Sequence, residues 1–144
     1  MASDRINLKS YVKDVIAEEG VSGSNYFTEA YSASDTTSNL SEGTVLTFRL
    51  PACLLSDVRM SLSDSPTGSS FIVDIQDDGV SIFSTLLSID VGEKTSTTSS
   101  SQFAFSSGEN YLVGEDSEIK IIITQVGAAN TGKHLIVRVS GTLI

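Results

Sequence analysis

Residues 71–82 read FIVDIQDDGVSI. Alternate residues from Phe71 to Ile75 are apolar, which is the two-residue period of a half-buried β-strand. The Asp-Asp-Gly sequence at 77–79 is typical of a tight turn, because Asp and Gly tolerate the left-handed backbone that such turns require. A short apolar segment follows this turn. The stretch therefore predicts a β-hairpin with one face on a core.

The same period governs the chain from Thr44 to its end. Apolar residues alternate in eight short segments, with Gly, Ser or Asp between them: 46–50, 58–62, 71–75, 80–82, 87–91, 103–105, 119–123 and 135–139. Short strands at this spacing predict an antiparallel sandwich or a small barrel. We expect an all-β domain over residues 44–144, built as an antiparallel β-sandwich or a small barrel.

The N-terminal stretch has a different period. Apolar residues between 7 and 19 follow the spacing of one helix face: Leu8, Tyr11, Val12, Val15 and Ile16. Gly20 is a suitable residue for the end of this helix. A single helix of this length is marginal in water, so we expect a partner to cover its apolar stripe.

Residues 20–43 have no sustained period and are rich in Ser, Gly and Thr, as in a linker. They also hold an aromatic cluster, Tyr26, Phe27 and Tyr31, which indicates an arm that packs on its own domain or on a partner. We therefore divide the chain into a helix and anchoring arm at 1–43 and a β-sandwich domain at 44–144. The five stripe residues and these three aromatics are the expected partner-binding residues.

The composition excludes several classes of partner and site. Nine basic and 18 acidic residues give a net charge of −9, which repels nucleic acid and anionic lipid. No apolar run is long enough for a membrane span, and Lys9, Lys13 and Asp14 interrupt any signal peptide. One His and one Cys exclude a zinc site of such ligands and an intrachain disulfide. We expect no nucleic-acid partner and no membrane.

Residues 127–133, GAANTGK, match the G-x-x-x-x-G-K pattern of a phosphate loop. That loop needs a Ser or Thr after the Lys to hold magnesium, and it needs a helix to follow. His134 stands in that position, and residues 135–139 alternate like a strand. We therefore interpret 127–133 as a hairpin loop.

The remaining candidate residues for metal binding or catalysis also have a simpler structural interpretation. Asp74, Gln76, Asp78 and Gly79 resemble the start of a calcium loop, but Thr85 occupies the position of its bidentate Glu. A hairpin turn is the preferred interpretation. His134 is the single imidazole, and no G-x-S-x-G sequence is present. Cys53 lies in an apolar stretch typical of a buried thiol. We expect no catalytic residue, no metal and no cofactor.

Three blocks of sequence resemble a known class of domain. They are SPTG at 65–68 with the hairpin at 71–82, IDVGEKTS at 89–96, and IKIIITQVG at 119–127 with GKHLIVRVSG at 132–141. Their order resembles a small β-sandwich domain in virion structural proteins of tailed bacteriophages, notably those of marine bacteria and cyanobacteria. The resemblance covers residues 45–143 and leaves the N-terminal stretch uncovered.

The resemblance favours the sandwich, in the jelly-roll form of about eight strands that is common in viral shells. It implies a non-enzymatic virion structural protein that is assembled in the host cytoplasm. We expect it to decorate the capsid surface through its N-terminal segment, on the major capsid protein or another virion protein. The resemblance also suggests a homo-oligomer, a trimer in particular. The alternative is a short tail or fibre component that binds a host-surface receptor or glycan. Glycan recognition usually uses exposed aromatic rings, yet the chain has no Trp. The aromatics expected to be exposed are Tyr26, Tyr31, Phe83 and Tyr111.

Overall fold

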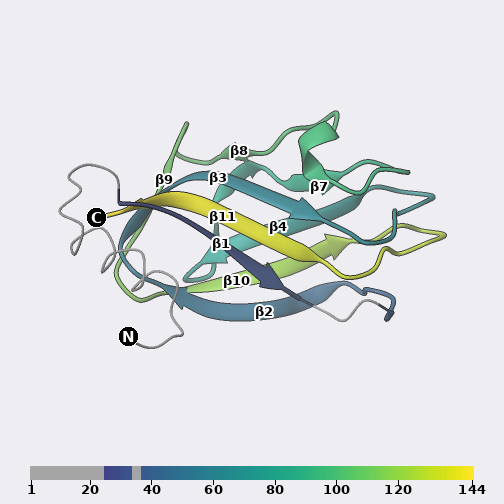
Figure 1. Cartoon of the computed structure of the whole chain (residues 1–144), viewed down its shortest axis with the longest axis horizontal. Helices are drawn as coiled ribbons and strands as arrows, with labels where there is room; N and C mark the ends of the chain where they lie inside the picture. The colour runs from purple at the N-terminus through teal and green to yellow at the C-terminus, as the bar shows by residue number, and fades with distance from the viewer. Residues whose placement is uncertain (1–24, 34–36) are drawn as a thin grey trace.

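The computed structural model describes residues 25–33 and 37–144. Over these residues the chain is all-β, and two antiparallel sheets pack face to face as a β-sandwich (Figure 1). No helix in this part of the chain has the length and apolar character needed to cross a membrane. The helix expected at 7–19 lies outside the described residues, and so do the five residues of its apolar stripe.

The two sheets divide most of the strands between them. Sheet I has the order β1 (Tyr26–Ser32), β11 (Ile136–Leu143), β3 (Cys53–Ser61) and β9 (Tyr111–Val113). Sheet II contains β2 (Gly43–Leu50), β10 (Ser117–Gln125) and β4 (Phe71–Asp77), with β5 (Val80–Ser81) and β7 (Leu87–Ile89) both beside β4. A separate ribbon pairs β6 (Phe83–Thr85) with β8 (Ala104–Phe105), and one short 3-10 helix, η1, spans Ser96–Thr98.

The strand pairs are nested in the order of the chain. β1 pairs with β11, β2 with β10, β3 with β9, and β4 with β7, all antiparallel. Successive pairs alternate between sheet I and sheet II. A long antiparallel hairpin that folds over in this way gives the jelly-roll arrangement. The fold class expected from the sequence is therefore confirmed over the described residues.

The core forms because the two-residue period directs one set of apolar side chains inward from each sheet. Ile121 of β10, Phe71 of β4 and Val58 of β3 are each 0% exposed. Each such side chain contributes about 1.5–3 kcal/mol on burial before the entropic cost of ordering. Cys53 is buried here too, as its apolar neighbours predict.

The predicted hairpin at 77–79 is confirmed. Asp77 pairs with Val80, and the two residues between them have positive φ, 48° at Asp78 and 88° at Gly79. This is the type I′ geometry that Asp-Gly favours, because Gly has no Cβ to clash. The Asp78 amide donates to the Glu118 carbonyl at 2.9 Å, and its carboxylate accepts from the Glu118 amide at 3.0 Å. The turn is thereby fastened to β10.

The expected boundary at residue 44 is wrong for residues 26–32. They form β1, which pairs with β11 from Tyr26 opposite Thr142 to Ser32 opposite Ile136. Phe27 is 2% exposed and belongs to the core of the sandwich. The alternation of apolar residues is weak here because β1 is an edge strand, paired on one side, and carries several polar residues.

The loop at residues 127–134 joins β10 in sheet II to β11 in sheet I, so it is a connection between sheets and not the expected hairpin loop. The Thr67 amide donates to the Asn130 carbonyl at 3.0 Å, and the Ala129 amide donates to the Thr67 carbonyl at 2.9 Å. A Cβ on Gly127 would lie 1.9 Å from the Asn130 carbonyl oxygen, so only glycine fits there. The strand predicted after this loop is present as β11.

Candidate functional site

A groove of about 250 Å³ lies on the outer face of sheet I, where β1, β11 and β3 meet the segment that contains η1. Its polar and charged lining comes from side chains far apart in the sequence: Arg59, Ser61, Thr95, Thr97 and Arg138. Ala30 and Ile136 supply aliphatic surface beside them. We call this feature the arginine groove.

The register of three strands brings the lining residues together. Arg138 of β11 is opposite Arg59 of β3 on one side and Ala30 of β1 on the other. Ile136 is opposite Ser61 in the same register. Directly paired residues point to the same face of a sheet, with Cβ atoms about 4.5–5.5 Å apart. The register therefore places Arg59 and Arg138 side by side on the same face of neighbouring strands.

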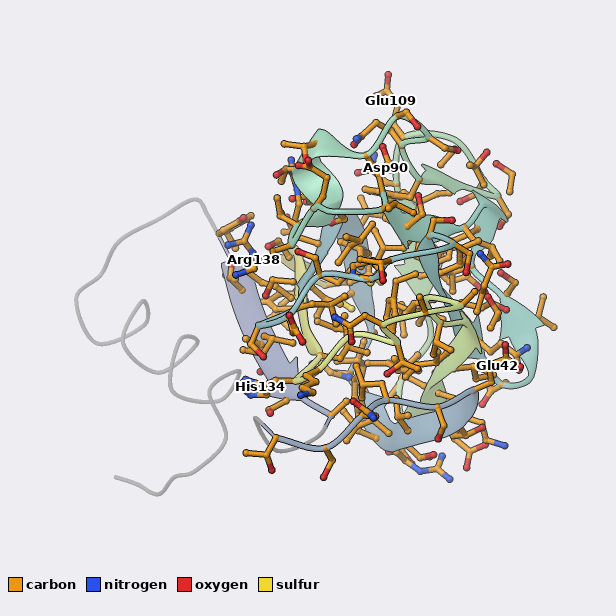
Figure 2. All side chains as sticks on the ribbon, turned by 90° about the vertical axis from the view of Figure 1, so that its right-hand side faces the viewer. Glu42, Asp90, Glu109, His134 and Arg138 are labelled. Carbon is orange, nitrogen blue, oxygen red and sulfur yellow. The ribbon has the colours of Figure 1, made fainter. Side chains whose placement is uncertain are left out.

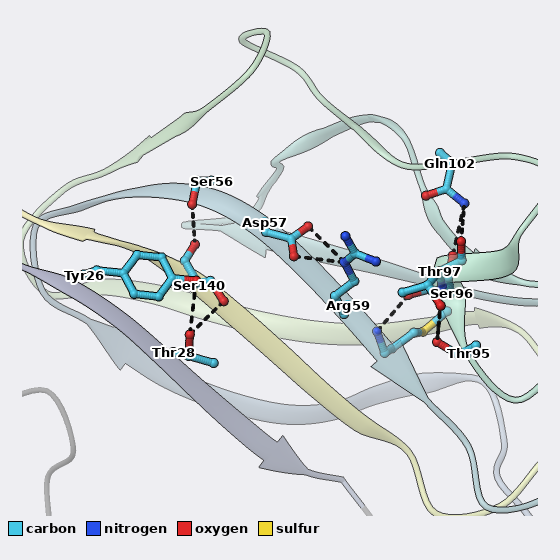
Figure 3. A network of polar contacts seen from close by, with 11 residues as sticks. Tyr26, Thr28, Ser56, Asp57, Arg59, Thr95, Ser96, Thr97, Gln102 and Ser140 are labelled. Carbon is cyan, nitrogen blue, oxygen red and sulfur yellow. Dashed lines mark hydrogen bonds and ion pairs between the residues drawn. The ribbon is translucent and has the colours of Figure 1, made fainter.

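The far wall of the groove is held in place by hydrogen bonds to β3 and within the η1 segment (Figure 3). The Met60 amide donates to Ser96 Oγ at 2.9 Å, and Ser96 is 4% exposed. The Thr97 amide donates to Thr95 Oγ1 at 3.2 Å, which caps the start of η1. Gln102 Nε2 donates to the Ser99 carbonyl at 2.7 Å from the other side of the turn. The threonine hydroxyls thus have fixed positions beside the two arginines.

Asp57 engages one edge of one arginine. Arg59 Nε lies 2.9 Å from Asp57 Oδ2 and 3.2 Å from Asp57 Oδ1 (Figure 3). The Nη groups of Arg59 donate to no other described residue. Arg138 is exposed, and within residues 25–33 and 37–144 its side chain makes no hydrogen bond or ion pair. Most guanidinium donors in the groove therefore remain available to a ligand.

The local charge differs from that of the whole chain. The chain carries a net charge of −9, yet two of the three arginines that follow residue 24 meet in this groove. Figure 2 shows Arg138 on the side of the sandwich where β1 runs, with the acidic Glu42 on the far side. Guanidinium groups bind carboxylate, sulfate and phosphate with two parallel hydrogen bonds, and hydroxyls can donate or accept. This arrangement can hold a polar ligand with one anionic group.

The aromatic residues expected to bind a partner have different environments. Phe27 is buried in the core, and Tyr31 stacks on Phe48 of β2 with ring centroids 4.0 Å apart. These two side chains pack on their own domain, which corrects their assignment to partner binding. Tyr26 is 51% exposed on the outer face of sheet I. Hydrogen bonds from the hydroxyls of Ser140 and Thr28 lower the pKa of Tyr26.

Two other aromatics that the sequence suggested were exposed, Phe83 and Tyr111, make contacts within the fold. Phe83 is 6% exposed and packs with Phe103 and Phe105, so it is not the exposed residue that the sequence suggested. The Tyr111 hydroxyl donates to Asp77 Oδ2 at 3.1 Å. Burial, followed by the negative charge of Asp77, raises the pKa of Tyr111.

The calcium-like segment and His134 form no metal or catalytic site in the described residues. Asp74 of the calcium-like segment accepts a hydrogen bond from Ser81 within the hairpin. In residues 25–33 and 37–144 no group of three or more His, Cys, Asp and Glu is placed to hold a metal ion. His134 Nε2 lies 3.1 Å from Ser32 Oγ, beside the edge strand β1.

Sequence reasoning missed the arginine groove. Arg59 and Arg138 each occupy an ordinary outward position in a predicted strand, where a charged residue needs no special explanation. The signal lies in the register between β3 and β11, which places them opposite one another. The local sequence pattern does not determine which residues of two distant strands lie opposite each other.

Comparison with protein-family models, with known proteins and with solved structures finds no match to this chain.

Proposed function

We propose that this chain is a non-enzymatic structural subunit of a tailed-bacteriophage particle, displayed on the capsid surface. The nested strand pairing is the observation that carries the proposal, because jelly-roll sandwiches recur in viral shells and in lectins. The resemblance of the three sequence blocks to phage virion domains supports the same role.

The blocks that carry the resemblance form central parts of the fold. The first contains the hairpin of β4 and β5, and the third contains β10 and β11. β10 lies between β2 and β4 in sheet II, and β11 lies between β1 and β3 in sheet I. The resemblance therefore rests on strands that organise both sheets, which supports a shared fold more strongly than similar loops would.

The two ends of the sandwich suit attachment and display. The Leu143 amide donates to the Asn25 carbonyl at 3.1 Å, so the chain enters β1 beside its own C-terminal strand. The η1 segment and the arginine groove beside it lie toward the opposite end of the sandwich (Figure 1). An anchor N-terminal to β1 would leave that opposite end pointing outward.

Substitutions in the predicted apolar stripe test the attachment step. Val12→Glu combined with Ile16→Glu places two charges on the predicted apolar face, while Lys13→Gln changes the predicted polar face and serves as the control. Particles assembled with each variant are purified, and the bound protein is quantified. We expect the double variant to keep its melting temperature and to be lost from particles, and the control to be retained. Normal incorporation of the folded double variant would contradict the anchor.

The arginine groove favours a second role, receptor or glycan binding. The arginine groove offers free cationic donors and hydroxyls away from the end where the chain enters β1. Such a surface supports the alternative of a short tail or fibre component that binds a host-surface receptor or glycan. Localisation at the tail, in place of a repeating position on the shell, would favour this alternative.

A further inference from the structure

Arg59 and Arg138 place two like charges directly opposite each other on neighbouring strands. Like charges directly opposite each other on neighbouring strands repel and destabilise the sheet. Asp57 offsets the charge of Arg59 through Nε, but no described residue forms an ion pair with Arg138. An anion bound between the two guanidinium groups would remove the repulsion and use their free N–H donors.

The rest of the groove indicates what kind of molecule would carry that anion. Thr95, Thr97 and Ser61 line the groove next to the arginines. The Thr95 and Thr97 hydroxyls hydrogen-bond each other at 2.9 Å, which leaves one hydroxyl proton and acceptor lone pairs between them for ligand hydroxyls. Ala30 and Ile136 add a small aliphatic surface. A sugar ring presents hydroxyls at its edge and C–H groups on its face, so it complements both parts of this lining.

The size of the groove limits the ligand. Its volume of about 250 Å³ lies just below the range of about 300–1,000 Å³ that is usual for pockets holding drug-sized ligands. A single sugar residue with one charged group matches this space better than an extended polymer segment. An inorganic ion would leave the threonine hydroxyls and the aliphatic surface without contacts.

We propose that the arginine groove binds an acidic sugar residue, with its carboxylate between Arg59 and Arg138 and its hydroxyls toward Thr95 and Thr97. This site does not depend on the proposed place of the chain in a phage particle. It would serve the receptor-binding alternative directly, and on a capsid subunit it would give the particle surface an affinity for acidic polysaccharide.

Calorimetric titration of the full chain tests the proposal. The probes are D-glucuronate, the neutral sugar D-glucose and sodium sulfate, at matched ionic strength. We expect saturable binding of glucuronate and at least about tenfold weaker binding of glucose, because a lost charge-assisted pair is worth about 1.4 kcal/mol or more. We also expect glucuronate to bind more weakly as salt is raised.

Two variants assign the binding to the groove. Arg138→Gln removes a side chain without structural partners among the described residues, so the fold should persist, and glucuronate binding should weaken at least about tenfold. Arg49→Gln is the matched control, because Arg49 is an exposed arginine whose ion pair with Asp116 is 3.9 Å long and lies outside the groove. We expect Arg49→Gln to bind glucuronate like the parent chain.

Three results would overturn the proposal. Absence of saturable glucuronate binding would remove the site, and unchanged binding by Arg138→Gln would place it elsewhere. Sulfate that binds as tightly as glucuronate would contradict the sugar assignment, because the hydroxyl lining would then contribute nothing. None of these results bears on whether the chain is incorporated into particles, so failure here is distinguishable from failure of the proposed function.

Discussion

Arg59 and Arg138 are opposite each other in the antiparallel register of β3 and β11, on the outer face of a sheet in a strongly acidic protein. A sequence selected for stability alone would place opposite charges or a neutral residue here, because such pairs favour the sheet. The energetic cost of this pair can be measured.

Replacing one member of the pair should stabilise the ligand-free protein. Arg138→Gln removes the cross-strand repulsion, and we expect the free energy of unfolding in low salt to rise by about 0.2–1 kcal/mol. Urea denaturation measures this change. Arg49→Gln is the control and should leave stability within about 0.5 kcal/mol. A less stable Arg138→Gln would show that the pair is not repulsive.

The far wall of the groove depends on one buried hydroxyl. Ser96→Ala leaves the Met60 amide without its acceptor, and an unpaired buried amide costs about 1–3 kcal/mol. We expect a lower melting temperature, together with faster proteolysis in the η1 segment. Ser106→Ala alters an exposed serine and should change neither. Equal melting temperatures for the two variants would contradict this role of Ser96.

The connection between the sheets should tolerate no side chain at Gly127. An added Cβ would lie 1.9 Å from the Asn130 carbonyl, so Gly127→Ala must displace the loop, at a cost of about 1–3 kcal/mol or more. At Gly114 the nearest atom to an added Cβ is Ser117 Oγ at 3.5 Å, an ordinary contact. Gly114→Ala is therefore the matched control. Denaturant midpoints of the two variants should differ clearly, and coincidence would refute the close approach.

Residues 26–32 should behave as part of the sandwich. Phe27→Ala empties a core position, and loss of a buried phenylalanine costs about 3–5 kcal/mol. Tyr26→Ala, at the neighbouring exposed position, should cost much less. Thermal unfolding compares the two variants. If Phe27→Ala proved as stable as Tyr26→Ala, the packing of Phe27 in the core would not contribute to the stability of the sandwich.

The tyrosines should make the protein sensitive to alkali. Burial, then the hydrogen bond to Glu29, raises the pKa of Tyr31, and burial with the charge of Asp77 raises the pKa of Tyr111, both from 10.0. The folded state then keeps protons that the unfolded chain releases above pH 10.0. Stability from these groups is complete below that pH and is lost as the pH rises through the folded values.

Substitutions of Tyr31 and Tyr26 should change the pH dependence of stability in opposite directions. Urea unfolding of Tyr31→Phe should show a shallower loss of stability between about pH 9 and about pH 11 than the parent chain. Tyr26→Phe should show a steeper loss, because hydrogen bonds from Ser140 and Thr28 lower the pKa of Tyr26 and its effect has the opposite sign. Identical profiles for the two variants would contradict the assignment.

The sequence predicted the long strands well because their alternation is sustained. β10 and β11 follow the period at 119–123 and 135–139, and the Asp-Gly turn of the first hairpin appears with the expected geometry. Prediction failed where the period is short or broken. β6 and β9 have only three residues each, and the chain bends at Ile82, so Ile82 and the adjacent Phe83 are both buried.

The arginine groove could not be predicted in the same way. Sheet pairing between β3 and β11 depends on how the whole chain folds over, and a one-residue slip would move every side chain to the other face. The local sequence around Arg59 and around Arg138 predicts that each side chain points outward. It does not predict which residue lies opposite on the neighbouring strand. The two arginines therefore become a site only in the folded sandwich.

The copy number of this chain in purified particles decides whether it is a repeating subunit on the surface of a phage particle, as proposed above. Quantitative mass spectrometry, calibrated against the major capsid protein, measures that number. We expect the chain in a fixed ratio to the capsid protein, as a repeating shell position requires. Its absence from particles, or a few copies confined to the tail fraction, would refute the proposed role.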